Sequence, residues 1–277
     1  MAQPIYPCFW FNNQAKEAAT FYCSLFEGAT ITAENPLVVI MELNGKKYMH
    51  LNGGPMFSIT PAISMFVTCE TDQEIEMLWE NLSRDGSTLM PLGSYPWSEK
   101  YAWVKDKFGL TWQLMLGQVP PHGEKIHPSF LFSNDQYGKA RAALNQYAAI
   151  FPNSKLHEQQ LYTANEGQPE GNLKFAHFHL NGAFFSAMDG PGDNAFTEGF
   201  SLVVNCDTQE EIDHYWNALT EGGTESQCGW LKDRFGVSWQ IVPSVLEKLM
   251  SDPEKSGRVV QAFMKMKKMD IATLENA

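Results

Sequence analysis

Positive charge is scarce in this chain. Lysine and arginine together number 20, against 32 aspartate and glutamate residues, so the formal net charge is −12. A protein with this excess of negative charge repels phosphate backbones and anionic lipid surfaces. The sequence therefore predicts neither a nucleic acid nor a membrane as a partner.

Long apolar runs and paired cysteines are also missing. No run approaches the roughly 20 apolar residues that span a bilayer. The start of the chain lacks the charged and apolar regions of a signal peptide. The five cysteines show no C-x-x-C spacing, which disfavours a disulfide framework or a zinc knuckle. We therefore expect a cytoplasmic protein.

A repeat dominates what is present in the 277 residues. The segment 69–75 recurs as 206–212, an offset of 137, and 103–113 recurs as 230–240, an offset of 127. The difference of ten residues places an insertion near 89–100 in the first copy. The repeat predicts one copy at 1–117, a proline-containing linker at 118–125, a second copy at 126–243 and a helical tail at 244–277.

Each copy shows the same order of expected elements. In the first copy, a strand at 5–11 precedes a helix at 14–26 and a hairpin that turns at Asn44-Gly45. A second strand at 63–69 precedes a helix that begins at Thr71, with Glu74 completing a capping box. We predict an α+β protein with two βαβββ modules in each copy. The apolar spacing of 253–269 predicts an amphipathic helix that packs on the body.

Several segments resemble one known family. They are Cys228–Pro243 with its Trp-Gln ending, Thr208–Ile212, Leu51–Pro55 and Met266–Ile271. They are similar to the PhnB-like, or 3-demethylubiquinone-9 3-methyltransferase-like, group of the vicinal oxygen chelate superfamily, which also includes glyoxalase and bleomycin-resistance proteins. The resemblance implies a bacterial protein whose paired modules curl around a cup. Many members build that cup across a dimer interface, so a homodimer is one option and pairing within this chain is another.

The resemblance also implies positions for a divalent metal on the floor of the cup. Carried onto this chain, they are Pro7, His50, Ser64 and Gln113 in the first copy, and Pro128, Ala187, Ser201 and Gln240 in the second. His50 alone among them is a ligand that zinc or nickel prefers. A shift of one residue in the alignment with the family would add His127. Gln113 and Gln240 either hold the floor by hydrogen bonds or join a metal. His177 and His179 share one strand face, where we expect packing or solvent contact rather than metal binding.

Two other chemistries receive little support from the sequence. Gly190–Ala195 matches G-x-G-x-x-A, but a strand rather than a helix follows it, so we expect a loop without phosphate-binding function. The methyltransferase activity in the family name is therefore not expected. Cys69 and Cys206 end matching strands, where small apolar residues pack well, so we expect core residues rather than nucleophiles.

Aromatic residues supply the most suggestive candidates for a binding site. Trp97, Tyr101 and Trp103 in the first copy and Trp230 in the second lie on strands or on the loops that enter them. The inserted segment 91–98 has no counterpart in the second copy and is rich in proline and glycine. We expect it to form a loop over the mouth of a cup, where Trp97 would stack on a flat ligand.

Three hypotheses about function follow. The first is binding of an aromatic or antibiotic-like small molecule in a cup, without turnover or a cofactor. The second is a lyase, isomerase or dioxygenase that uses a divalent metal held by His50 with Gln113 or Gln240. The third is a structural dimer whose tail binds a partner. The residues leave open whether the protein is an enzyme.

Overall fold

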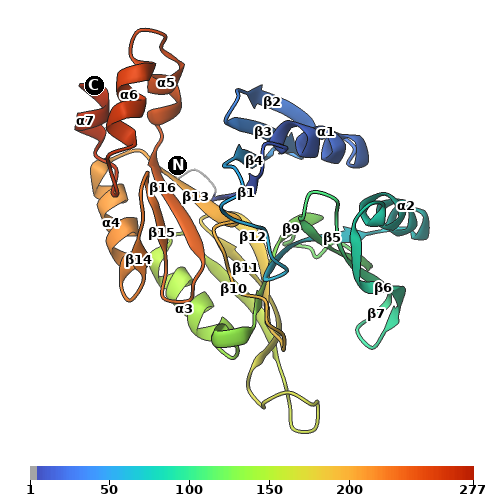
Figure 1. Ribbon diagram of the computed structural model, residues 1–277. Coiled ribbons are helices and arrows are strands. Elements are labelled where there is room, and N and C mark those ends of the chain that lie inside the picture. The colour runs from blue at the N-terminus through green and yellow to red at the C-terminus, as the bar shows by residue number, and fades with distance from the viewer. Residues whose placement is uncertain (1–4) are drawn as a thin grey trace.

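A computed structural model describes residues 5–277, which form two eight-stranded sheets flanked by helices (Figure 1). The first copy contains β1 (Tyr6–Phe11), α1 (Ala15–Leu25), β2 (Thr30–Glu34), β3 (Val38–Leu43), β4 (Lys46–Asn52), β5 (Ile63–Cys69), α2 (Asp72–Ser83), β6 (Ser87–Tyr95), β7 (Ser98–Lys105) and β8 (Thr111–Leu116). The second contains β9 (Ile126–Phe132), a 3₁₀ turn (Asn134–Gln136), α3 (Ala140–Ile150), β10 (Lys155–Leu161), β11 (Leu173–Leu180), β12 (Ala183–Asp189), β13 (Phe200–Cys206), α4 (Gln209–Thr220), β14 (Thr224–Glu225), β15 (Trp230–Lys232) and β16 (Ser238–Pro243). This order confirms four βαβββ modules and the α+β class.

Each sheet combines one module from each copy. Sheet 1 has the order β14-β15-β16-β13-β1-β4-β3-β2, and sheet 2 has the order β10-β11-β12-β9-β5-β8-β7-β6. The two modules join through antiparallel pairing of β1 with β13 in sheet 1 and of β5 with β9 in sheet 2. The resemblance allowed the modules to pair either across a dimer interface or within one chain. In this structure they pair within the chain.

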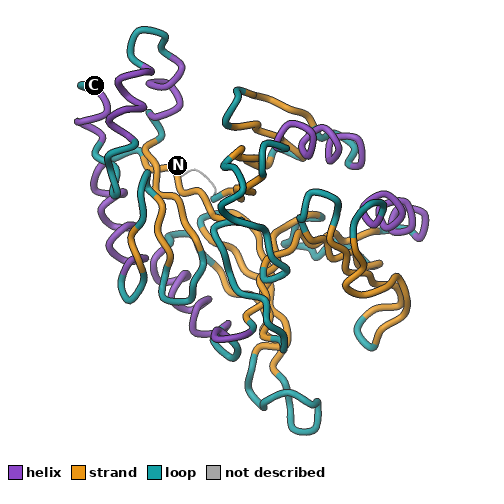
Figure 2. The backbone as a smooth tube through the Cα atoms, in the orientation of Figure 1, coloured by secondary structure: helices purple, strands orange, loops and turns teal. Residues whose placement is uncertain are grey.

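The inner faces of both sheets contribute to one large core. Phe9 and Phe200 of sheet 1 meet at a ring distance of 5.6 Å, and Phe200 lies 6.2 Å from Phe130 of sheet 2. In Figures 1 and 2, α3 and α4 lie on one side of the molecule and α1 and α2 on the other. Side chains at the centre of the opposite, outer faces are also buried, as expected for curled sheets. We call the outer face of sheet 1 cup 1 and that of sheet 2 cup 2.

The signature Asp-x-x-Gly-x-x-Trp has a structural role in both copies. Asp106 Oδ2 accepts hydrogen bonds from Tyr22 Oη and Trp112 Nε1, both at 2.8 Å. Its Oδ1 accepts from the backbone of Phe108 and Leu110 at 2.9 and 3.1 Å. Asp233 makes the equivalent four bonds in the second copy. Each buried carboxylate therefore ties the first helix of its copy to the last hairpin.

Helix α2 begins as the sequence predicts. Thr71 Oγ1 accepts from the backbone N–H of Glu74 at 3.2 Å, and Glu74 Oε2 accepts from the N–H of Glu70 at 2.9 Å. Two backbone donors at the helix start are thereby satisfied, which confirms Thr71 as the N-cap, while the return bond of Glu74 goes to the N–H of Glu70 rather than to that of Thr71.

The insertion of the first copy is a β-hairpin and not the expected loop. β6 and β7 pair across residues 87–105, and their register is interrupted at several points between Thr88 and Tyr95. β6 is the edge strand of sheet 2, where bulges accommodate Pro91 and Gly93. The corresponding edge strand of the second copy, β14, has only two residues.

The tail packs on the body, but its long helix is divided. Instead of one helix over 253–269, α5 (Leu246–Ser251), α6 (Ser256–Phe263) and α7 (Ile271–Glu275) are separate. The carbonyls of Met266 and Lys267 accept backbone hydrogen bonds from Cys228 and Gly229 at 2.7 and 2.8 Å. These bonds hold 264–270 in a non-helical path, while Val259 remains fully buried.

Candidate functional site

Strand alternation places three serines side by side on the floor of cup 2. Ser129 on β9 is the register partner of Ser64 on β5 and of Ser186 on β12, and all three are fully buried. Ser64 Oγ accepts hydrogen bonds from Trp103 Nε1 at 3.0 Å and from Thr111 Oγ1 at 2.9 Å. Thr111 Oγ1 is also 3.2 Å from the carbonyl oxygen of Ile63, so its single hydroxyl hydrogen is shared between two acceptors. Ser129 Oγ has no hydrogen-bond partner among the described residues.

Gln113 and Tyr101 extend this floor toward β7. Gln113 projects from β8 into cup 2, and its Oε1 accepts the hydroxyl hydrogen of Tyr101 at 2.9 Å. Both side chains are buried, and burial raises the pKa of Tyr101 above its usual value. Tyr101 therefore remains an uncharged donor that fixes the orientation of the Gln113 amide.

The tip of the β6–β7 hairpin adds an aromatic cluster beside this pair. Trp97 stacks on Tyr95 at 5.2 Å and meets Tyr101 edge-on at 5.6 Å. The Trp97 side chain is 55% exposed, whereas Tyr101 is 5% exposed. Trp97, Tyr101 and Gln113 thus form a continuous series from the solvent to the floor of cup 2. Trp103 lies on the same face.

His127 also faces cup 2, as the sequence allowed after a shift of one residue. Its Nδ1 lies 3.2 Å from the carbonyl oxygen of Glu124 and is therefore the protonated nitrogen. Its Nε2, 3.1 Å from Ser186 Oγ, then accepts the serine hydroxyl hydrogen. Burial and the nearby His177 lower the pKa of His127 to about 3. Such a weak base is poorly suited to activating a nucleophile near neutral pH.

Cup 1 contains the remaining two predicted binding residues. Gln240 Nε2 donates to Ser201 Oγ at 2.9 Å, beside Cys8 on β1. Trp230 meets Trp10 edge-on at 5.9 Å near the end of β1. Burial raises the pKa of the Cys8 thiol to about 12. The six predicted binding residues are therefore divided between two cups on different sheets.

His50 lies in neither cup. It faces the inner side of sheet 1, where it is fully buried against Phe9, Phe11 and Tyr22 at ring distances of 5.6 to 5.8 Å. Neither ring nitrogen makes a hydrogen bond of ordinary geometry, and burial lowers the pKa of His50 to about 4. The structure therefore does not bring His50 together with Gln240, on the opposite face of the same sheet, or with Gln113, on the other sheet.

Three more positions carried over from the resemblance also face inward. Pro7, Pro128 and Ala187 alternate with the side chains that reach the cups. The residues at the cup floors are instead their neighbours Cys8, Ser129 and Ser186, together with Met49 beside His50. The sequence signal that could have found them is the run of inward phenylalanines at Phe9, Phe11, Phe130 and Phe132.

The cup floors fit a divalent metal poorly. They offer one imidazole, His127, with both nitrogens already hydrogen-bonded, together with one thiol of raised pKa, a thioether, hydroxyls and amides, whereas zinc and its neighbours need three or four imidazole, thiolate or carboxylate ligands. Across residues 5–277, no three His, Cys, Asp or Glu side chains are arranged to hold a metal ion. The residues present therefore do not fit the metal that the resemblance implies for the cup.

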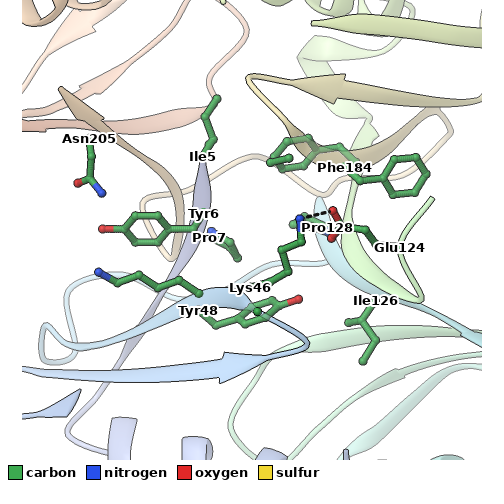
Figure 3. A pocket seen from close by; sticks show the side chains of 14 residues that line it. Ile5, Tyr6, Pro7, Lys46, Tyr48, Glu124, Ile126, Pro128, Phe184 and Asn205 are labelled. Atoms are coloured by element: carbon green, nitrogen blue, oxygen red, sulfur yellow. Dashed lines mark ion pairs between the residues drawn. The ribbon is translucent and has the colours of Figure 1, made fainter. Parts of the chain in front are cut away.

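A cavity of about 170 Å³ lies where the two sheets meet, near the starts of β1 and β9 (Figure 3). Its lining includes Tyr6 and Tyr48 from one sheet, Phe184 from the other, and the ion pair of Lys46 with Glu124 at 2.8 Å. Sequence reasoning missed this cavity because five segments far apart in the chain contribute to it.

Two expectations about other chemistry agree with the structure. Gly190–Ala195 connects β12 to β13 and does not open a helix. Cys69 and Cys206 are buried, and burial raises the pKa of each thiol to about 12. Separately, no helix within residues 5–277 is long and apolar enough to cross a bilayer.

Solved structures place this architecture among known folds. The chain is similar to glyoxalase I from Zea mays, with 10% identity, a TM-score of 0.60, and coverage of 90% of this chain and 96% of that one. A PhnB protein from Bacillus cereus is 39% identical over 40% of this chain and 96% of its own, with a TM-score of 0.38. A search of curated proteins finds no match.

One sequence family accounts for both copies. The profile described as 3-demethylubiquinone-9 3-methyltransferase matches residues 3–115 and again 124–242. Together with four βαβββ modules and the glyoxalase I fold, the two matches agree with the internal repeat. The chain therefore belongs to the 3-demethylubiquinone-9 3-methyltransferase, or PhnB-like, family as a tandem duplication with the glyoxalase fold.

Proposed function

We propose that the chain binds a flat, aromatic small molecule in cup 2 without transforming it. The observation that carries the proposal is the series Trp97, Tyr101 and Gln113, which links an exposed indole to a buried, oriented amide. An aromatic platform beside a few fixed polar groups is typical of small-molecule sites. In the second copy the corresponding hairpin, β14–β15, has an edge strand of only two residues, so the proposal favours cup 2 over cup 1.

The polar groups of cup 2 indicate what the ligand would offer. Ser129 Oγ is buried without a hydrogen-bond partner among the described residues, and it lies between Ser64 and Ser186 in the serine row. A buried polar group of this kind is stabilised by about 1–3 kcal/mol when it gains a hydrogen-bond partner. We therefore expect a ring that carries a carbonyl, hydroxyl or ring nitrogen facing the serine row.

Binding without turnover is supported by the acid–base properties of the cup. His127 has a pKa of about 3, and each of its ring nitrogens already has a hydrogen-bond partner. Burial also lowers the pKa of His177, the register partner of Ser186, to about 4, and the serine hydroxyls and the Gln113 amide do not titrate near neutral pH. Recognition needs only positioned donors and acceptors, and these are present.

The duplication supplies a matched control for testing the proposal. Gln113→Leu and Gln240→Leu remove equivalent amides from cup 2 and cup 1, respectively. A panel of aromatic and heteroaromatic compounds would first be screened by ligand-observed NMR, and the affinities of the hits measured by calorimetry. We expect Gln113→Leu and Trp97→Ala each to weaken binding at least tenfold, and Gln240→Leu to change it less than twofold.

Two results would contradict the proposal. One is equal loss of affinity in the two glutamine variants, and the other is loss confined to Gln240→Leu. Thermal unfolding of each variant shows whether the fold is retained. Incubating each hit with the protein and analysing it by mass spectrometry tests the claim that the ligand is not transformed.

A further inference from the structure

Histidines gather on the cup 2 face of sheet 2, toward the edge that β10 and β11 form. Four of the seven in the chain, His127, His157, His177 and His179, lie with their ring centroids 4.7 to 6.5 Å from that of Phe184. His122 stacks on His157 at 5.7 Å. His157 and His179 are half-buried, so solvent and small ions reach them.

A β-bulge directs two of these rings toward one another. The register of β10 with β11 shifts between Leu156 and Gln159, and His157 lies within the shift. His157 Nε2 is consequently 2.9 Å from His179 Nδ1 on the neighbouring strand, and one of the two nitrogens donates a hydrogen bond to the other. Bulges commonly redirect a side chain at functional positions.

This separation suits two ligands of one transition-metal ion. Nitrogen–metal distances of 2.0–2.1 Å put two ligands at right angles about 2.9 Å apart, and two tetrahedral ligands about 3.3 Å apart. Right-angle geometry is usual for Ni²⁺ and Cu²⁺, so the nitrogen separation matches these ions once the donor ring carries its proton on its other nitrogen and both rings turn toward the ion, whereas tetrahedral Zn²⁺ also needs a shift of a few tenths of an ångström.

We propose that His157 and His179 form a surface site for a divalent transition-metal ion of the Ni²⁺, Cu²⁺ or Zn²⁺ class, with water completing the coordination. The site uses two protein ligands, on β10 and β11 of the cup 2 face, and shares no residue with the serine row or with Trp97, Tyr101 and Gln113. It is independent of ligand binding in cup 2.

The charge around the pair influences the expected affinity in two ways. Burial, with nearby Lys155, lowers the pKa of both histidines, so both are neutral and able to bind metal at pH 7. The positive charges of Lys155 and Lys46 also oppose a bound cation. We therefore expect two imidazoles near these lysines to bind the metal ion with a dissociation constant in the micromolar rather than the nanomolar range.

The first copy shows that the fold does not require these histidines. The same bulge occurs between Ile31 and Ala33, where Thr32 takes the place of His157. Across the strands, Glu42 stands in the place of His179 and Ile40 in that of His177. The backbone feature is thus common to both copies, while the paired imidazoles are specific to the second.

The test is titration of the full, untagged chain with NiCl₂, followed by calorimetry. We expect one Ni²⁺ per chain in the micromolar range. His157→Ala, His157→Gln and His179→Ala should each weaken binding at least tenfold, and the exposed His214→Ala should change it less than twofold. Paramagnetic broadening of the His157 and His179 imidazole signals in ¹H–¹⁵N spectra should locate the ion.

Binding that is unchanged in His157→Ala and His179→Ala would overturn the proposal, as would the absence of binding below millimolar Ni²⁺. The glutamine variant keeps a hydrogen-bonding group at position 157 and so separates lost metal binding from lost structure. Equal thermal unfolding midpoints for this variant and the wild type would confirm that the fold is intact.

Discussion

At the scale of single residues, the decisive variable is the face of the strand on which a side chain lies. On β4, Tyr48 and His50 face the core, while Met49 and Leu51 face cup 1. All four types of residue are compatible with burial, so alternation alone does not identify the inward pair. For this reason the sequence identified His50 as a histidine to test but could not place it. It correctly allowed His127 to face cup 2.

The environment of His50 predicts a pH-dependent stability. Its folded pKa of about 4 lies below the unfolded value of 6.5, so the unfolded chain binds the proton more readily. The stabilisation is complete above pH 6.5 and is lost as the pH falls toward 4. Between pH 7.5 and 5 the loss is about 2 kcal/mol for this residue alone.

Urea denaturation of wild type and His50→Leu at both pH values measures this contribution. His127 and His177 add to the wild-type dependence because burial lowers their pKa values as well. The variant should therefore keep part of the dependence and lose about 2 kcal/mol of it. An identical change in unfolding free energy for both proteins would contradict the assignment of His50 to the core.

At the scale of elements, local sequence signals succeeded where backbone chemistry is explicit. The N-cap at Thr71 and the hairpin turn at Asn44-Gly45 both occur as expected. The prediction of a loop over 91–98 was wrong because proline and glycine are equally compatible with a loop and with a bulged edge strand. The prediction of one continuous helix over 253–269 was wrong because backbone hydrogen bonds to Cys228 and Gly229 compete with helical hydrogen bonds in this segment.

The buried aspartate of each copy offers a test at this scale. In Asp106→Asn, an amide N–H₂ would replace one carboxylate oxygen in a site where all four contacts are donors. At least one buried donor would lose its acceptor, so we expect the unfolding free energy to fall by roughly 2–4 kcal/mol. Chemical denaturation provides the measurement, and Asp233→Asn provides the matched variant. A loss below about 0.5 kcal/mol for both would show that these bonds do not hold the fold.

At the scale of the whole molecule, the duplication predicted four modules, and the exchange of modules between copies became clear only from strand pairing. One helix and three strands lie between β5 and β9 in the chain, whereas β1 and β13 are separated by most of the chain. Pairing over such distances leaves no periodic signal in the sequence. The same limit applies to the two cups and to the cavity between the sheets.

Because each sheet is completed within one chain, one copy of the protein is sufficient to form both cups. We therefore predict a monomer of 31.2 kDa in solution. Light scattering coupled to size-exclusion chromatography, over a range of micromolar concentrations, measures this mass directly. A concentration-independent dimer would contradict the prediction and would call for a surface beyond the sheet pairing described above.

The most direct test of the central claim, ligand binding in cup 2, compares two equivalent tryptophans. Trp103 Nε1 donates to Ser64 on the floor of cup 2, and Trp230 holds the corresponding position in cup 1. Their indole N–H signals, assigned by Trp103→Phe and Trp230→Phe, would be followed by ¹H–¹⁵N NMR during titration with an aromatic hit. A saturable shift of the Trp103 signal with the Trp230 signal unchanged is the predicted result. A shift of Trp230 alone, or of neither signal at saturating ligand, would contradict binding in cup 2.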